Sequence, residues 1–234
     1  LLNMNNRYQR QTLLTEIGEE GQFKLQKARV LIVGVGGLGC PVALYLAGAG
    51  VGHIGLADDD VVSIHNLHRQ ILYNKSDIGL PKAECAVRHL HARNSDIEMK
   101  AYPVRLTSGN AEQLIAEYDI IVDGCDNHTT RYLISDICHR LKKTYVYAAI
   151  GAFQGQVAIL CHPENAATYR TLFPDEEVMG TVQAEKGVIG TTPAVVGSIA
   201  ANEVLKLIIG YGETLVNRMW YIDLLTLNTQ IIQL

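Results

Sequence analysis

The sequence has little of what marks a secreted, membrane-spanning or nucleic-acid-binding protein. Its five cysteines are widely spaced, odd in number and without a Cys-x-x-Cys pair. This favours reduced thiols in the cytoplasm over a disulfide framework or a zinc knuckle. No stretch approaches the ~20 uninterrupted apolar residues of a membrane span, and residues 1–10 lack the charged-then-apolar pattern of a signal peptide. A net charge of −4 without a basic run argues against nucleic acid as the main partner.

The residues that are present predict a single large α/β domain. Hydrophobic residues make up 48% of the 234 positions, so a sizeable core can form. Apolar runs alternate with helical patterns, which predicts βαβ units in a Rossmann-like, mostly parallel sheet with helices on both faces. The expected strands are 29–33, 53–57, 97–102, 119–123, 144–150 and 156–160, and the expected helices are 18–27, 37–49, 81–93, 110–117, 129–141 and 193–209.

The second part of the chain breaks this rhythm. Residues 161–190 contain several prolines and glycines and predict a long crossover loop with little regular structure. Two strand-like runs, 219–223 and 227–232, follow the last helix and predict an antiparallel extension of the sheet. We therefore expect one domain over 1–234, with a nucleotide-binding half of about 1–150 and a second half of about 151–234.

A glycine loop after the first strand predicts a phosphate site. Residues 30–33 are apolar and lead into Gly-x-Gly-Gly-x-Gly, formed by Gly34, Gly36, Gly37 and Gly39. Such a turn lets backbone N–H groups approach a phosphate at a helix start. The next strand ends in an acidic run with Asp58 and Asp60, which are placed to bond ribose hydroxyls. Many nicotinamide-dependent dehydrogenases carry the same motif. The motif alone therefore does not tell whether the chain binds a nicotinamide nucleotide or a different nucleotide.

Cationic and amide residues follow that acidic run and favour a triphosphate. The group consists of Asn66, Arg69, Gln70 and Lys82. Arg and Lys can offset charge on the β- and γ-phosphates and on leaving pyrophosphate, which a dehydrogenase does not require. The alternative is that Arg69 and Lys82 are solvated surface charges.

A carboxylate site is predicted where the fourth strand ends, in the run from Asp123 to Asn127. The carboxyl ends of parallel strands bind ligands in such sheets. Asp126 is suited to Mg²⁺, which takes one or two carboxylates together with substrate phosphates. The alternative is that these residues cap the following helix, a role in which Asp and Asn are common.

Seven short motifs in one order give the chain a family resemblance. They are Arg7-Tyr8-x-Arg10-Gln11, the glycine loop, Ala47-Gly-Ala-Gly-Val-Gly52, Asp58-x-Asp60, Asn66-Leu-x-Arg-Gln70, Pro81-Lys82 and Asp126-Asn127. From about residue 7 to the end, the chain resembles the ThiF/MoeB/HesA family, bacterial relatives of ubiquitin-activating enzymes. The runs 46–50 and 56–60 are most similar to the ThiF branch, which serves thiamine biosynthesis.

The resemblance implies ATP-dependent adenylylation of the C-terminal glycine of a small ubiquitin-like sulfur carrier, in thiamine or molybdopterin biosynthesis. It assigns Asp58 to the ribose, and Asp126 to Mg²⁺. The phosphates fall to Asn66, Arg69, Gln70 and Lys82. Arg10 would reach into the site of a neighbouring subunit, which implies a homodimer. A separate sulfur donor, such as a cysteine desulfurase, would then be a further partner.

The chain departs from the family pattern at two places. Many members hold a zinc ion with two Cys-x-x-Cys pairs, and Thr168 and Thr171 stand where the first pair is expected. We therefore predict no zinc. Gln183 stands where ThiF-like proteins keep a sulfur-handling cysteine, so covalent sulfur transfer is predicted to be lost or moved to a partner. The other functions considered are adenylylation of a peptide terminus or a modified tRNA base, a dehydrogenase, and an inactive scaffold.

Overall fold

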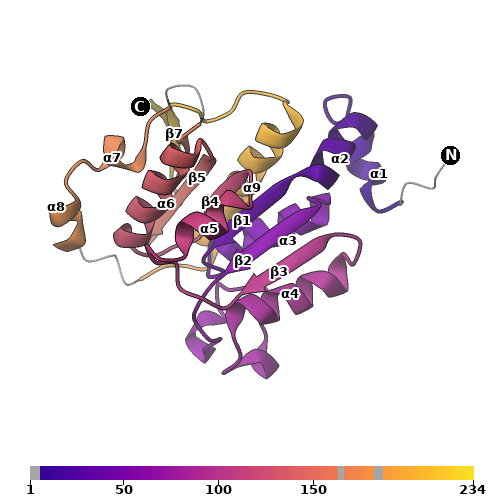
Figure 1. The fold of residues 1–234 in the computed structure, drawn as a ribbon, viewed down its shortest axis with the longest axis horizontal. Coiled ribbons are helices and arrows are strands. Elements are labelled where there is room, and N and C mark those ends of the chain that lie inside the picture. Colours follow the sequence, from indigo (N-terminus) through magenta and orange to yellow (C-terminus); the bar gives the residue numbers. More distant parts are fainter. Residues whose placement is uncertain (1–5, 163–165, 182–186) are drawn as a thin grey trace.

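The computed structural model describes residues 6–162, 166–181 and 187–234. In this part of the chain all named strands form one sheet in the order β3-β2-β1-β4-β5-β6-β7-β8 (Figure 1). The predicted strands all form, and their ends lie within two residues of those expected. The bounds are β1 Arg29–Val33, β2 His53–Ala57, β3 Glu98–Tyr102, β4 Ile120–Asp123, β5 Thr144–Gly151, β6 Gln154–Leu160, β7 Arg218–Asp223 and β8 Asn228–Gln233.

The predicted helices also form within two residues of the expected ends. Asn127 shows the local cause of one boundary, because its side chain accepts a hydrogen bond from the N–H of Thr130 at 2.9 Å and so caps α6. The α-helices are α1 Gln9–Thr12, α2 Gly18–Lys27, α3 Gly39–Ala49, α4 Lys82–Arg93, α5 Ala111–Ala116, α6 His128–Leu141, α7 Tyr169–Leu172, α8 Glu176–Thr181 and α9 Thr191–Ile209; the 3₁₀ helices are η1 Asn6–Tyr8, η2 Ile64–Asn66 and η3 Lys75–Asp77.

The sheet changes character in its middle. Strands β3, β2, β1, β4 and β5 pair in parallel, whereas β5 and β6 form an antiparallel hairpin that β7 and β8 continue. The antiparallel part therefore begins one strand earlier along the chain than the two C-terminal runs predicted. A short connection from Gly151 to Gln154 is enough for a hairpin, since only parallel pairs need a long crossover.

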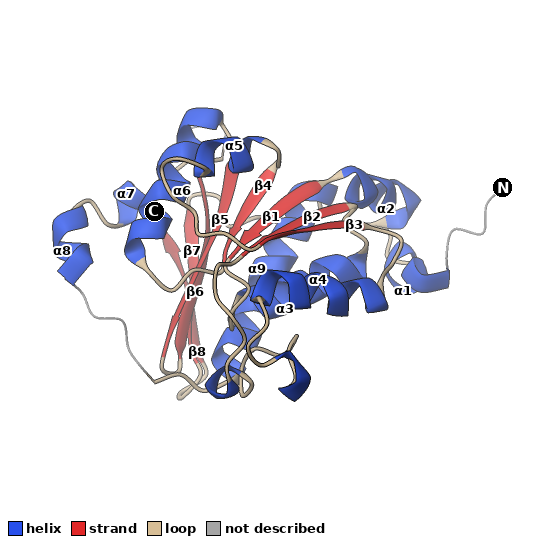
Figure 2. Ribbon diagram, turned by 60° about the horizontal axis from the view of Figure 1, so that its bottom comes forward, coloured by secondary structure: helices blue, strands red, loops and turns tan. Residues whose placement is uncertain are grey.

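Helices cover both faces of the sheet, as predicted (Figure 2). One face packs against α2, α3, α4 and α9 around a buried cluster that includes Ile32, Leu46 and Val204. The other face packs against α5, α6 and α7 around Leu31, Ile134 and Tyr169. The central strands β1, β2 and β4 are buried on both sides, which explains their largely apolar sequences.

Two segments of the second half need comment. The crossover contains the short helices α7 and α8, so it is more regular than predicted. Helix α9 is long and apolar enough, by length and composition alone, to cross a membrane. Here it packs against α3, α2 and the β5–β6 hairpin and carries the buried Glu203, which pairs with Lys206 at 2.6 Å. These contacts are those of a core helix.

Candidate functional site

The register of the parallel strands brings three functional segments to one edge of the sheet. Val33, the last residue of β1, pairs with Ala57 at the end of β2 on one side. On the other side it pairs with Asp123 at the end of β4. The glycine loop, the acidic run from Asp58 and the turn from Asp123 therefore leave the sheet together. A crevice between oppositely directed connections is where such sheets bind nucleotides.

The first and last glycines of the loop lie so close to other backbone atoms that a side chain would not be accommodated at either position. Gly34 has φ of +88°, a conformation that favours glycine, and a Cβ there would lie 2.5 Å from the carbonyl oxygen of Gly124. A Cβ on Gly39 would lie 2.0 Å from the carbonyl oxygen of Gly34. The loop thus packs backbone against backbone and leads directly into α3, whose N-terminus faces the crevice.

Asp58 is anchored to the glycine loop. Its Oδ2 accepts a hydrogen bond from the N–H of Val35 at 2.7 Å, and its Oδ1 accepts one from the N–H of Asp60 at 2.9 Å. Burial raises the pKa of Asp58, while these hydrogen bonds and the charge of Lys82 oppose the rise. The carboxylate retains free lone pairs, which is the arrangement required for a ribose hydroxyl.

Lys82 and Asp60 form an ion pair at the mouth of the crevice. The ammonium lies 2.7 Å from Oδ2 of Asp60, with the Lys82 side chain 6% exposed and that of Asp60 70% exposed. Lys82 therefore is not a solvated surface charge. The carboxylates of Asp58, Asp59 and Asp60 also lie within 4.8 Å of one another. Because Lys82 neutralises one of them, a bound triphosphate would compete with Asp60 for the ammonium.

The residues 66–70 divide between the crevice and the surrounding structure. Arg69 and Gln70 line the crevice, and Arg69 Nη1 donates to the carbonyl of His65 at 3.1 Å. Gln70 is buried, and among the described residues its Oε1 is a buried side-chain atom with no hydrogen-bond partner. Such an acceptor can take a hydrogen bond from a bound ligand. Asn66 is outside the lining, because its Oδ1 accepts from the N–H of Ser63 and stabilises η2.

Asp126 presents an exposed carboxylate in the turn between β4 and α6. It lines the crevice beside Asn127, whose side chain caps α6 as one of the two interpretations predicted. A single exposed carboxylate next to a triphosphate site fits Mg²⁺, which keeps several waters and shares its ligands with phosphate oxygens. Asp126 is thus suited to hold Mg²⁺ together with the nucleotide.

The crevice is a cleft of about 760 Å³ that extends beyond the nucleotide residues. Besides Lys82 it includes a second buried cation, Arg131, whose Nε donates to Oδ2 of the fully buried Asp123 at 2.9 Å. Burial and the charge of Arg131 lower the pKa of His128. Sequence reasoning missed several lining residues that come from α6, β5, β6 and the crossover: His128, Thr130, Arg131, Tyr147, Gln156, Phe173 and Met179.

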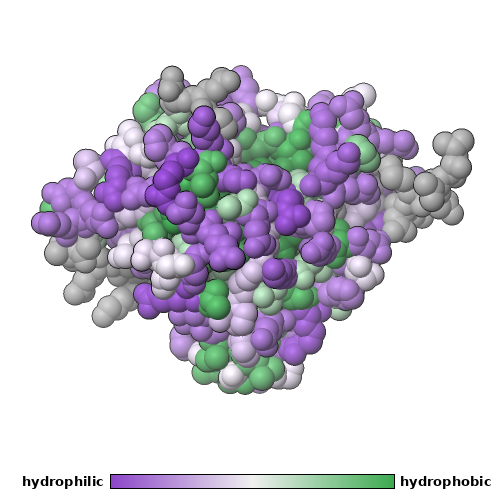
Figure 3. Space-filling model, viewed as in Figure 1, coloured by the Kyte–Doolittle hydropathy of each residue, from purple (hydrophilic) through white to green (hydrophobic). Residues whose placement is uncertain are grey.

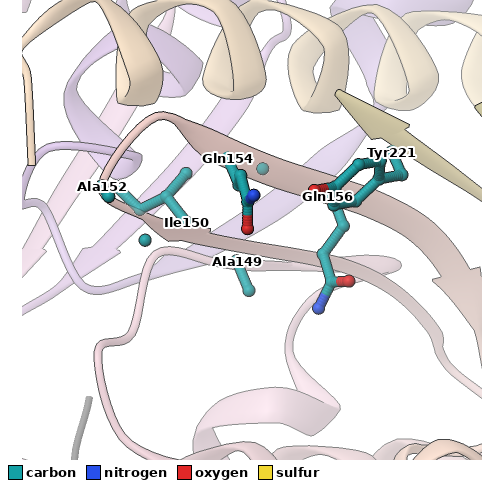
Figure 4. A pocket seen from close by; sticks show the side chains of 8 residues that line it. Ala149, Ile150, Ala152, Gln154, Gln156 and Tyr221 are labelled. Carbon is teal, nitrogen blue, oxygen red and sulfur yellow. The ribbon is translucent and has the colours of Figure 1, made fainter. Parts of the chain in front are cut away.

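A second, smaller pocket of about 280 Å³ continues from the cleft along the β5–β6 hairpin (Figure 4). The two share Ala149, Ile150, Gly151 and Gln156. Figure 4 shows that Ala149, Gln154 and Gln156 project to the same side of the hairpin. Half of the lining residues are alanine or glycine, so the pocket leaves room for a segment of extended chain. Gln amides supply hydrogen-bond donors and acceptors for its backbone.

Arg10 lies at the other end of the molecule from the cleft of its own chain. Its neighbour Gln11 donates from Nε2 to the carbonyl of Ala49 at 2.8 Å, and Tyr8 accepts from Nδ2 of Asn94 at 2.8 Å. Ala49 is the last residue of α3, which begins at the glycine loop. Since α3 has 11 residues, its two ends are about 16 Å apart. The exposed Arg10 side chain is absent from the lining of the cleft.

Of the two departures from the family pattern, the structure describes the one at Thr168 and Thr171. Thr168 caps α7, because its hydroxyl accepts from the N–H of Thr171, and the two hydroxyls lie 3.2 Å apart. Two mutually bonded threonines do not fit a zinc site, which takes thiolate or imidazole ligands. Gln183 lies outside the described residues. All five cysteines are free and buried, and burial raises the pKa of each thiol, to about 12 for Cys40 and about 11 for Cys161.

Comparisons with known proteins agree with this geometry. The model of the ThiF family matches residues 8–234. A sulfur carrier protein adenylyltransferase of Thermus thermophilus is 47% identical over 94% of this chain and 83% of its own length. The adenylyltransferase and sulfurtransferase MOCS3 of Culex quinquefasciatus is 45% identical over 95% of this chain, which spans about half (51%) of that relative. The crystal structure of E. coli MccB with ATP has a TM-score of 0.85 and 26% identity, covering 98% of this chain and 72% of that one.

Proposed function

Since the chain belongs to the ThiF family, we propose that it activates the C-terminal carboxylate of a small ubiquitin-like sulfur carrier as an acyl-adenylate. The fold and the family expected from the sequence are thereby confirmed, and the chain is an adenylyltransferase. Relatives named for sulfur-carrier adenylylation support the choice of carrier. The dehydrogenase and the inactive scaffold lose their support, because the cleft joins a phosphate loop to the cationic Arg69 and Lys82.

The single observation that carries this proposal is the continuity of the cleft with the smaller pocket at the β5–β6 hairpin. The cleft offers nucleotide-binding groups at one end, and the pocket offers small walls and Gln amides at the other. A glycine C-terminus is the kind of chain end that fits between Ala149, Gly151 and Gly155. Its carboxylate would meet the α-phosphorus where the two spaces join, near Ala149 and Gln156.

In the proposed reaction the carrier carboxylate attacks the α-phosphorus of ATP and pyrophosphate leaves. Asp58 would hold the ribose, and backbone N–H groups at the start of α3 would face the phosphates. Lys82 and Arg69 would stabilise charge on departing pyrophosphate. Mg²⁺, when held at Asp126 with the phosphates, would supply further neutralisation of the triphosphate. No thiol of the chain takes part, since the five cysteines are buried.

A homodimer is part of the proposal. Arg10 is too far from its own cleft to contact ATP there, so a role in catalysis requires the cleft of a second copy. The connection between β2 and α4 also exposes an apolar tip, and Figure 3 shows apolar residues gathered at that lower end of the molecule. Its members are between 41% and 63% exposed: Val61, Ile64, Ile71, Ile78 and Leu80. A patch of this kind is typical of protein interfaces.

The remaining parts of the proposal concern sulfur and location. A separate donor such as a cysteine desulfurase would deliver sulfur to the adenylate, in either thiamine or molybdopterin biosynthesis. No zinc is proposed at Thr168 and Thr171, because the two side chains satisfy each other. The cytoplasm is the proposed location, and the absence of disulfides among the five described cysteines supports it.

The proposal is tested by isotope exchange and by nucleotide titration. With Mg²⁺ and a carrier ending in glycine, the enzyme should exchange labelled pyrophosphate into ATP, and a carrier lacking the terminal glycine should not support exchange. Calorimetric titration should show binding of ATP and none of NAD. Tight binding of NAD without a response to ATP would contradict the proposal. Exchange that is supported by a peptide or a tRNA, but by no carrier protein, would identify a different substrate for the same reaction.

A further inference from the structure

Arg131 on α6 forms hydrogen bonds to the turn after β4, a role that none of the sequence motifs predicted. Its Nε donates to Oδ2 of Asp123 at 2.9 Å, and its Nη2 donates to the carbonyl of Cys125 at 2.6 Å. Nη2 also lies 3.3 Å from the carbonyl of Ala148 on β5. The hydroxyl of Tyr145 donates to the same oxygen of Asp123 at 2.9 Å. One guanidinium therefore joins α6, the β4–α6 turn and β5.

Further hydrogen bonds fix the conformation of this turn. Oδ1 of Asp123 accepts from the N–H of Cys125 at 2.8 Å, so the carboxylate also folds the turn back on itself. Gly124 donates from its N–H to the carbonyl of Val33 at 2.7 Å and packs on the glycine loop. Asp126 follows Cys125 in this turn, and its exposed carboxylate lines the cleft.

We propose that Arg131 is a positioning residue for adenylyl transfer: through Asp123 and Cys125 it fixes the turn that presents Asp126 to Mg²⁺ and ATP. This inference rests on the proposed function for the assignment of Asp126. Arg131 does not contact the nucleotide in the proposal. It acts on the backbone that carries the metal ligand, as outer partners do in metal sites, where they orient the groups that bind the ion.

The residue type matters because the acceptors lie in different directions. A guanidinium presents five N–H donors in a planar fork, which allows it to serve a carboxylate and two carbonyls at once. A lysine at this position would keep the charge that balances the buried Asp123 but would present one donor centre. Arg131→Lys is therefore the variant that retains the ion pair while loosening the turn.

The test measures how Mg²⁺ enhances the binding of ATP, by calorimetry on the full chain without any carrier. For Arg131→Lys we expect the Mg²⁺ concentration at half-maximal enhancement to rise about tenfold, at the low end of the 10–100-fold that outer partners contribute to metal binding. ATP affinity without Mg²⁺ should change by less than about twofold. Tyr145→Phe removes one donor to Asp123 and leaves the ring, so it should give a smaller rise in the same direction.

The matched control is Arg140→Lys, on the same helix, where the arginine pairs with Glu112 at the surface. It should leave both quantities unchanged. Wild-type Mg²⁺ dependence in Arg131→Lys and in Tyr145→Phe would overturn the inference, as would equal losses with and without Mg²⁺, which mark a purely structural role. Should Arg131→Lys fail to fold, Tyr145→Phe decides alone. An enzyme that binds Mg²⁺ and ATP normally but never modifies a carrier would instead contradict the proposed function.

Discussion

The two ends of the cleft hold their side chains in different ways. At the nucleotide end the functional groups are fixed by hydrogen bonds and ion pairs: Asp58 to Val35, Lys82 to Asp60, and Arg131 to Asp123. At the hairpin end the lining residues are uncharged. The exposed side chain of Gln154 donates to the surface carboxylate of Asp223 at 3.1 Å, and Gln156, where the pocket meets the cleft, donates to the hydroxyl of Tyr147 at 2.6 Å. One end is preorganised, and the other is open.

This difference matches the two kinds of ligand that we propose. A nucleotide has the same shape at every turnover, so a rigid arrangement of charges and N–H groups is efficient. A protein tail carries its own backbone donors and acceptors, and an open pocket with amide side chains can accept it. We therefore expect substitutions at the nucleotide end to reduce catalysis and substitutions at the hairpin end to reduce carrier binding.

The largest effect is expected for Asp126→Ala. Loss of the Mg²⁺ ligand leaves triphosphate charge uncompensated as pyrophosphate departs, so carrier-dependent pyrophosphate exchange should fall about 10³-fold. The matched control is Asp136→Ala, which removes a carboxylate on the helix α6 that follows this turn, where it pairs with Arg170 at the surface. Normal exchange by Asp126→Ala would show that the nucleotide end uses another carboxylate, and circular dichroism establishes that the variant is folded.

The second largest effect is expected for a substitution of Arg10. This residue can act at the nucleotide end only if a second copy of the chain supplies it. Arg10→Ala should lower exchange about 10²–10³-fold, at or below the range known for arginine fingers, with ATP binding nearly intact. Mixing it with inactive Lys82→Ala chains should restore part of the activity, because one site of the mixed dimer is complete. Mixing it with the double variant Arg10→Ala/Lys82→Ala should restore none. No rescue after demonstrated subunit exchange would argue against action between subunits.

A smaller effect should separate the hairpin end from the nucleotide end. Gln154→Trp fills the smaller pocket at the β5–β6 hairpin without changing a residue that lines the cleft. The KM for the carrier should rise about tenfold, which corresponds to about 1.4 kcal/mol of binding free energy. The affinity for ATP should stay at the wild-type value. Gln154→Ala, which opens the pocket, is the control, and an unchanged carrier KM in Gln154→Trp would place the tail elsewhere.

The smallest effect on the chemistry is expected from removing all five thiols. Their burial and raised pKa values make them packing residues. A variant with every cysteine replaced by Ala or Ser should lose stability, by roughly 0.5–3 kcal/mol per site, measured by urea denaturation. If folded, it should exchange pyrophosphate at the wild-type rate. A folded variant that does not exchange pyrophosphate would show that a thiol takes part in adenylylation.

The sequence predicted the features that depend on residues close together along the chain. The strands β1 and β2, the glycine loop and Asp58 follow from neighbouring residues, because an apolar run and a tight turn are local properties. Arg131 and Tyr147 were missed because they reach the cleft from α6 and β5, and only the packing of distant segments brings them together. Asn66 was assigned to phosphate, yet its side chain stabilises η2. Its phosphate role stays a prediction, as does that of Arg10.

The central claim is tested most directly by the mass of the carrier after incubation with enzyme, ATP and Mg²⁺. We predict that a carrier with a C-terminal glycine gains one adenylyl group at its terminal carboxylate and that pyrophosphate forms in equal amount. The Asp126→Ala enzyme and a carrier without its terminal glycine should give no such product. An unmodified carrier in the presence of a folded, ATP-binding enzyme, or an adenylyl group at any other position, would contradict the account.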